Sequence, residues 1–143
     1  MAGEHFLSPL LVPTTRPLAL VVAGRERTVA TTVEGAFSAA DRTRGLLGRP
    51  SLARDSALVI APCSAIHTFA MQFPIDVIFT ARDGRVLRIR HDLAASNVAR
   101  AARAFAAIEM AAGEAARHEL RVGDQLRLIP QTEERSQGSS NPG

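Results

Sequence analysis

The dipeptide Asp83-Gly84, which separates the β-rich runs Ile75–Thr80 and Arg85–Arg90, constrains the fold of this chain more than any other feature. Both central residues of a two-residue type I′ turn have positive φ, which Asp and Gly tolerate better than other residues. The pattern therefore predicts an antiparallel hairpin with its turn at these two residues, and a β-containing fold around it.

A two-residue loop also fixes which side chains of the hairpin share a face. It places Asp76 opposite His91, on the face that carries aliphatic side chains and is expected to form the core. A buried carboxylate needs a partner or must take up a proton. His91 is one candidate partner, and such a pair can orient a catalytic imidazole. Arg44, Arg49 or backbone amides are the alternative partners for a purely structural carboxylate.

The rest of the chain contains further short elements. The additional expected strands are Leu18–Val22, Thr28–Val33, Ala57–Ala61 and Gln125–Ile129. Ser38 can cap a short helix over 39–47, which stops near Gly48. Residues 93–112 leave two readings open, because their alanine content favours a helix whereas Phe105–Met110 could form a strand. This pattern predicts a mostly β fold, a compact β sandwich or partly open barrel with one or two short helices.

The length of 143 residues fits one domain. We expect an irregular, proline-bearing lead-in over 1–17, a single β-rich domain over 18–130 and a disordered polar tail over 131–143. The N-terminus lacks a convincing signal peptide, no apolar run approaches the length of a membrane span, and Cys63 is the one cysteine. The cytoplasm is therefore the expected location.

Composition excludes some functions. All 17 basic residues are arginine, so lysine-dependent covalent chemistry is impossible. The formal net charge is only +3, the arginines are scattered, and Trp and Tyr are absent. Nucleic-acid binding is unexpected, because it calls for clustered positive charge and stacking aromatic rings.

Several segments resemble one known family when taken in order. They are Arg44–Arg49 followed by Ser51-Leu52, Phe69–Phe79, Asp83–Val86, Glu109–Glu114 and Gly123-Asp124. Together they span about residues 40 to 128 and are similar to the domain of unknown function 192 family. The resemblance implies a compact β sandwich of jelly-roll type with a strand near 104–110. It brings no established activity.

One segment departs from the family's common pattern. Many members carry Trp-Met-Lys-Asn-Thr before a Pro-Leu-Asp segment, whereas this chain has His67-Thr68-Phe69-Ala70-Met71 there. The chain therefore resembles a variant subgroup. No role tied to the family's Trp or Asn is transferred to it.

Cys63, His67 and Met71 follow one another at four-residue spacing. Residues so spaced share one face of a helix, and also one face of an unbroken strand. Thiolate, imidazole and thioether together suit a soft metal such as copper. The alternative is that these are ordinary packed side chains, since free Cys and Met commonly fill cores.

Arg44 and Arg49 offer a further candidate site, because the glycines between them let the backbone approach an anion closely. The plainer alternative is a helix end with solvated arginines. The candidate ligand pocket comprises His67, Met71, Asp76, Arg44, Arg49 and His91.

No catalytic set assembles from the sequence. We therefore expect a non-enzymatic binding or accessory module with an unknown small ligand or protein as partner and an unknown cofactor. The alternative is an enzyme or soft-metal site built on His67, Asp76 and Cys63. A third possibility, a protein-docking surface, predicts an exposed apolar patch.

Overall fold

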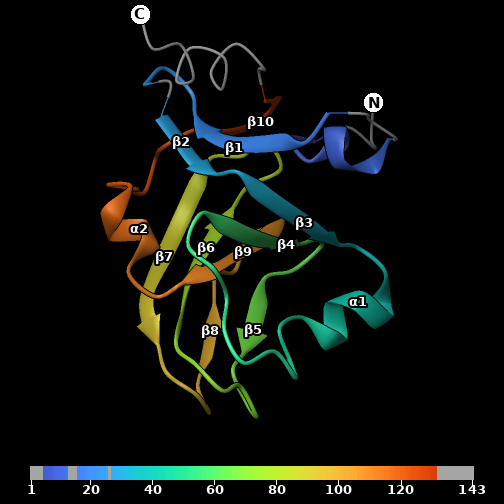
Figure 1. Ribbon diagram of the computed structural model, residues 1–143, viewed down its shortest axis with the longest axis vertical. Coiled ribbons are helices and arrows are strands. Elements are labelled where there is room, and N and C mark those ends of the chain that lie inside the picture. Colours follow the sequence, from blue (N-terminus) through green and yellow to red (C-terminus); the bar gives the residue numbers. More distant parts are fainter. Residues whose placement is uncertain (1–4, 13–15, 26, 132–143) are drawn as a thin grey trace, which may run out of the picture.

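Three β-sheets form the framework of this computed structural model, which describes residues 5–12, 16–25 and 27–131 (Figure 1). The strands are β1 (Leu18–Val22), β2 (Arg27–Ala30), β3 (Thr32–Ala36), β4 (Ser56–Ile60), β5 (Ala65–His67), β6 (Ile75–Thr80), β7 (Val86–Leu93), β8 (Val98–Arg100), β9 (Ala106–Ala111) and β10 (Leu126–Pro130). One sheet has the strand order β10-β1-β2, a second β3-β4-β9-β6-β7, and the third pairs β5 with β8.

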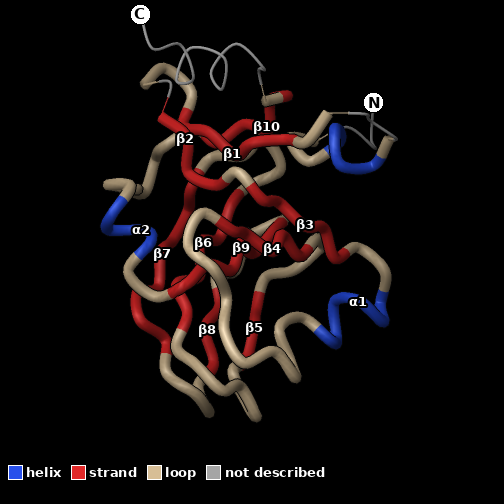
Figure 2. The backbone as a smooth tube through the Cα atoms, in the orientation of Figure 1, coloured by secondary structure: helices blue, strands red, loops and turns tan. Residues whose placement is uncertain are grey.

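The expectation of a mostly β, sandwich-like fold is confirmed, and the described strands close no barrel. Two short helices, α1 (Ala39–Arg44) and α2 (Glu114–Arg117), lie at the periphery with one 3₁₀ helix, η1 (Ser8–Leu11) (Figure 2). Of the pairs within the five-stranded sheet, β3 and β4 run parallel and the others antiparallel. None of the helices in the described residues combines the length and apolarity that crossing a bilayer requires.

Strands β6 and β9 form the centre of the molecule, and every residue of β6 is buried. Side chains alternate between two cores along these strands, as the strand period of two requires. Ile78 and Ile108 belong to the core shared with the three-stranded sheet, here called the upper core. Val77 and Phe79 belong to the core on the opposite, lower face, here called the lower core, which Ile66 of β5 and other residues complete. Whether a residue of β6 or β9 has an odd or an even position along its strand therefore decides which of the two cores its side chain enters.

Strands β6 and β7 form the expected hairpin, but its turn is longer than predicted. The backbone N–H of Ala81 donates to the oxygen of Arg85 at 2.9 Å, so the loop contains residues 82–84 instead of two residues. A bulge beside Thr80 restores the register at the centre, and a second lies between residues 75 and 77. The second bulge removes Asp76 from the position opposite His91, whose side chain is exposed. The predicted Asp76–His91 pair is therefore wrong.

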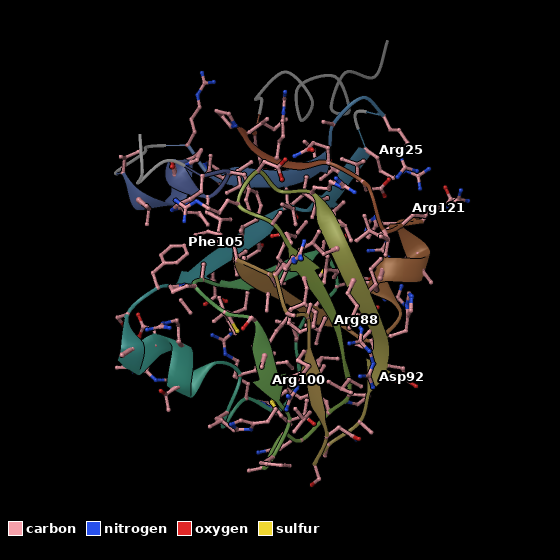
Figure 3. The ribbon with its side chains drawn as sticks, turned by 180° about the vertical axis from the view of Figure 1, so that it is seen from behind. Arg25, Arg88, Asp92, Arg100, Phe105 and Arg121 are labelled. Carbon is pink, nitrogen blue, oxygen red and sulfur yellow. The ribbon has the colours of Figure 1, made fainter. Side chains whose placement is uncertain are left out.

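Arg88 of β7 ties the five-stranded sheet to the small one. Its Nη1 donates to the backbone oxygen of Arg100 in β8 at 2.6 Å, and Figure 3 shows both residues on the same side of the molecule. This bond helps to hold β5 and β8 beneath the lower face of the larger sheet.

One predicted strand is divided in the structure, and the predicted helix ends early. The expected strand Thr28–Val33 is divided at Thr31, where the chain leaves the three-stranded sheet as β2 and enters the five-stranded sheet as β3. The N–H groups of Thr31 and Thr32 both donate to the backbone oxygen of Asp55, which holds this crossing in place. The helix expected over 39–47 ends at Arg44, because Gly45 has φ 46° and ψ −125°, outside the helical region.

Two other expectations are confirmed. The backbone N–H of Asp41 donates to Ser38 Oγ at 3.1 Å, so Ser38 caps α1. Residues 106–111 form strand β9, as the family resemblance implied and against the helix propensity of their alanines. Pairing on both sides, with β4 and β6, outweighs that weak local preference.

The lead-in is less irregular than expected where it is described. Leu7 is fully buried in the core with Phe6 and Leu10 packed beside it, and the N–H of Phe6 donates to the oxygen of Arg82 at 2.9 Å. Residues 6–10 thus pack against the domain. Gln131 contacts the domain too, whereas residues 132–143 of the predicted disordered tail lie outside the described residues.

Candidate functional site

A pocket of about 460 Å³ lies between α1, the segment that follows β4, and strand β5. Its apolar wall includes Leu46, Ile60 and Ile66, which also belong to the lower core. Its polar lining includes Arg42 and Glu109. The volume is in the range of pockets that hold small organic molecules.

Local backbone features create this pocket. Gly45, with φ 46°, ends α1 and returns the chain so that Leu46 is buried, only 2% exposed, at the pocket wall. Arg42 connects α1 to the segment after β4 across the pocket, because its Nη1 donates to the backbone oxygen of Pro62 at 3.1 Å. Helix α1 therefore forms one side of a cavity whose floor is the central sheet.

Glu109 is the buried acid of this pocket. It lies on β9 opposite Leu58 of β4 and Val77 of β6, and its residue exposure is 5%. Among the described residues no hydrogen bond to its carboxyl group is found, and a Cβ built on Gly45 would lie 4.0 Å from its Oε1. Burial raises the pKa of Glu109 to about 7, against the opposing effect of Arg49. The carboxyl group can therefore accept or donate a hydrogen bond near neutral pH.

Cys63, His67 and Met71 all line this same pocket, although they share neither a helix nor one strand. Cys63 Sγ donates to the oxygen of Ala65 at 3.2 Å, and burial raises the pKa of its thiol. His67 Nδ1 accepts from the N–H of Phe69 at 3.4 Å, and the two rings stack with centroids 5.0 Å apart. The three predicted ligands thus line one cavity, as their spacing suggested, but a turn brings them there instead of one face of a helix or strand.

Cys63, His67 and Glu109 do not form a ready-made metal centre. Within the described part of the chain, one group of three His, Cys, Asp or Glu donor atoms lies within 4.8 Å of one another, and it consists of Asp55, Glu114 and His118. That group lies outside the pocket lining.

The other predicted site residues are separated by the fold. Arg44 lines the pocket, with a side chain 70% exposed. Arg49 instead forms a bidentate pair with Glu34, at 3.0 and 3.1 Å, so the two arginines do not enclose an anion together. His91 and Asp76 are absent from the pocket lining.

Asp76 is buried as expected, but backbone amides hold it. Its Oδ1 accepts from the N–H of Asp92 at 2.8 Å, and its Oδ2 accepts from those of Gly113 and Ala115 at 3.1 and 2.8 Å. The carboxylate thus connects the central strand to the end of β7 and the first turn of α2. Asp76 thus stabilises the fold through backbone amides, which is one of the alternatives that the sequence left open.

Glu109 was not predicted as a site residue. The signal that singled out Asp76, an acid inside an apolar run, is also present in the segment Ala106–Ala111. The strand register places the two acids on opposite faces of the sheet. Asp76 pairs with Met110 and points to the upper core, whereas Glu109 pairs with Val77 and points to the lower face.

Comparison with known proteins gives a family for this fold. The family model DUF192, described as "Uncharacterized ACR, COG1430", matches residues 20–128. The chain belongs to the DUF192 family. The matched residues include β9 with Glu109 and the whole segment that carries Cys63, His67 and Met71. No curated protein matches the chain.

Two solved structures share the fold of this DUF192 chain. A protein of unknown function from Novosphingobium aromaticivorans is 24% identical with a TM-score of 0.68, and the match covers 76% of this chain and 83% of that one. A protein of Sinorhizobium meliloti, described as a proposed transcription regulator, is 21% identical with a TM-score of 0.68, over 81% and 97% of the two chains. At these identities the likeness shows the fold alone.

Proposed function

We propose that this DUF192 domain is a non-enzymatic binding module, located in the cytoplasm, whose pocket between α1 and β5 holds a small organic molecule. The observation that carries the proposal is Glu109. It is a nearly fully buried acid that opens into a cavity of about 460 Å³ and finds no hydrogen-bond partner among the described residues. Its carboxyl oxygens reach the pocket, so a ligand that supplies a hydrogen-bond donor can replace solvent there, and a hydrogen bond to a carboxylate is stronger than one between neutral groups.

The lining indicates the chemical class of the ligand. Leu46, Ile60 and Ile66 offer an apolar wall. The Nε of Arg42, also in the lining residues, is buried without a partner in the described chain and can donate to an acceptor. A small amphipathic molecule with an apolar body and a hydroxyl or amino group satisfies these groups together.

The experiment is an amide-shift titration of the full chain with matched probe pairs. Each pair consists of a small alcohol and its methyl ether, for example cyclohexylmethanol and cyclohexylmethyl methyl ether. We expect the alcohols to shift amides of residues 42–47 and 60–67 and those of β9. Shifts scattered over the surface, or confined to other regions, would contradict the proposal.

A blocking variant tests the location. Ala65 is exposed and lines the pocket, so Ala65→Trp fills the cavity while leaving the core side chains in place. We expect it to remove the alcohol-induced shifts. The matched control is Val122→Trp, which adds the same ring at an exposed residue, 62% accessible, outside the pocket lining.

A second candidate is a soft-metal site, favoured by the convergence of Cys63, His67 and Met71 on one pocket. Titration of the reduced chain with copper(I) separates the two functions. Stoichiometric copper lost in Cys63→Ser and Met71→Leu would support the metal site. The binding-module proposal instead predicts that these two variants retain the alcohol-induced shifts.

A further inference from the structure

A second cluster of ionisable side chains lies where α2 packs against the turn before β4, away from α1 (Figure 1). Glu114 begins α2 and His118 is its C-cap residue. The two are four residues apart, so their side chains lie on the same side of the helix. Asp55 faces them from the turn before β4. One donor atom from each of the three lies within 4.8 Å of the others.

His118 is the member of this cluster whose ring nitrogen makes no hydrogen bond among the described residues. The residue is 8% exposed, and its Nε2 is buried without a hydrogen bond in the described chain. The same nitrogen points to the two carboxylates, since it lies 3.6 Å from Oδ1 of Asp55 and 3.6 Å from Oε1 of Glu114. Buried polar atoms are rarely left unsatisfied, because their desolvation is then not offset. A cation bound between the three side chains would give this nitrogen a partner.

We infer that Asp55, Glu114 and His118 bind a divalent zinc ion. Zinc bonds to nitrogen and oxygen donors are about 2.0–2.2 Å long, so two donors at tetrahedral positions lie about 3.4 Å apart. The separation of 3.6 Å from His118 Nε2 to each carboxylate oxygen is close to that value. One imidazole and two carboxylates are a donor set that zinc accepts, with a fourth position left for water.

Arg117 is the group that competes with the ion. Its Nη2 donates to Asp55 Oδ1 at 2.6 Å and to Glu114 Oε1 at 2.7 Å, the two oxygens that zinc requires. The Arg117 side chain is 41% exposed, so Nη2 can turn towards solvent as the ion enters.

A backbone contact holds Glu114 in place for the ion. The Nε of Arg117 also donates to Glu114 Oε2 at 2.7 Å, but the guanidinium is one rigid plane, so this bond is released together with those of Nη2. The backbone N–H of Asp55 donates to Glu114 Oε1 at 2.9 Å. The carboxylate is therefore oriented before the ion binds.

Zinc titration of the tag-free full chain by calorimetry tests this site. We expect one zinc ion per chain, and binding weakened at least about tenfold in His118→Gln. Arg117→Met removes the competing guanidinium, so it should tighten binding several-fold. The controls are His91→Gln, at an exposed histidine, and Cys63→Ser, in the pocket, both expected to bind zinc like the wild type.

Cobalt(II) spectra and the ring nitrogen resonances of His118 provide readouts that do not depend on His118→Gln folding. We expect the visible bands of four-coordinate cobalt without a sulfur charge-transfer band, and a shift of the His118 ring nitrogens when zinc is added. Absence of zinc binding in both the wild type and Arg117→Met would overturn the inference and leave the cluster a structural ion-pair network. Binding that is lost in Cys63→Ser and kept in His118→Gln would also overturn it.

Discussion

The carboxylate of Asp76 and the backbone N–H of Ala115 are joined by a hydrogen bond of 2.8 Å, across 39 positions of sequence. With the bonds from Asp92 and Gly113, it connects the central strand β6, the end of β7 and the start of α2. These N–H groups would be left without partners in this partly or wholly buried region if the carboxylate were removed. Asp76 therefore holds α2 against the sheet.

Asp76→Asn is expected to lower the free energy of unfolding by about 1–3 kcal/mol, because the amide NH₂ replaces one of the two accepting oxygens. Denaturant unfolding of both proteins measures the difference. The matched control is Asp92→Asn, at an exposed residue with φ 52°, which keeps the backbone donor to Asp76. Equal effects of the two substitutions would show that the buried carboxylate has no special role.

Gly84→Ala is expected to destabilise the fold more than Gly24→Ala does. Both glycines have positive φ, 94° and 85°, so alanine is strained at both by about 1 kcal/mol. A Cβ at Gly84 would also collide with the backbone oxygen of Leu126, whereas one at Gly24 meets no atom within 4 Å. Thermal unfolding of the two variants compares them. A smaller loss at Gly84 than at Gly24 would contradict the close packing of the hairpin turn against β10.

Cys63 is expected to react slowly with an aromatic disulfide reagent at pH 8. Burial raises the pKa of the thiol, and reagents attack the thiolate. Because the chain has one cysteine, absorbance of the released thiolate reports on this residue alone. The same measurement in denaturant gives the reference rate. We expect the folded chain to react at least about tenfold more slowly, and equal rates would show an accessible, activated thiol.

Glu109 is expected to make stability fall as the pH rises from about 4.5 to about 7. In this window the unfolded chain releases the proton of the carboxyl group, whereas the folded chain retains it, because burial raises the folded-state pKa to about 7. The full effect at pH 8 is worth about 3 kcal/mol.

Denaturant unfolding of wild type and Glu109→Gln at several pH values isolates this effect. The charged or titratable groups near Glu109 are Arg49, Cys63, Arg42, Arg44 and His67, and both proteins contain them. We expect the stability of the wild type relative to the variant to fall from pH 4.5 to pH 8. A pH-independent difference would show that the Glu109 pKa is not raised.

Much of the fold is predictable from local signals, and the exceptions have physical causes. The β6–β7 hairpin, the Ser38 cap and the burial of Asp76 all follow from residues close in sequence. The partners of Asp76 come from 16 to 39 residues away, and a bulge decides its neighbour on β7. Neither the distant hydrogen-bond partners nor the bulge can be predicted from a local sequence pattern.

The candidate site shows the same division. The spacing of Cys63, His67 and Met71 singled out three residues that do line one pocket. Glu109 was missed, because its segment has the composition of a helix and becomes a strand only through pairing with β4 and β6. Its orientation then depends on strand register, which a single sequence does not specify.

The most direct test of the ligand pocket compares the dissociation constants of cyclohexylmethanol and its methyl ether at pH 8, for wild type and Glu109→Leu. At this pH the Glu109 carboxyl is mostly ionised and only accepts hydrogen bonds. We predict that the wild type binds the alcohol about tenfold more tightly than the ether, as expected for a hydrogen bond to a charged group. Glu109→Leu should bind the two equally. Equal binding by the wild type, or a preference that survives in Glu109→Leu, would contradict the account.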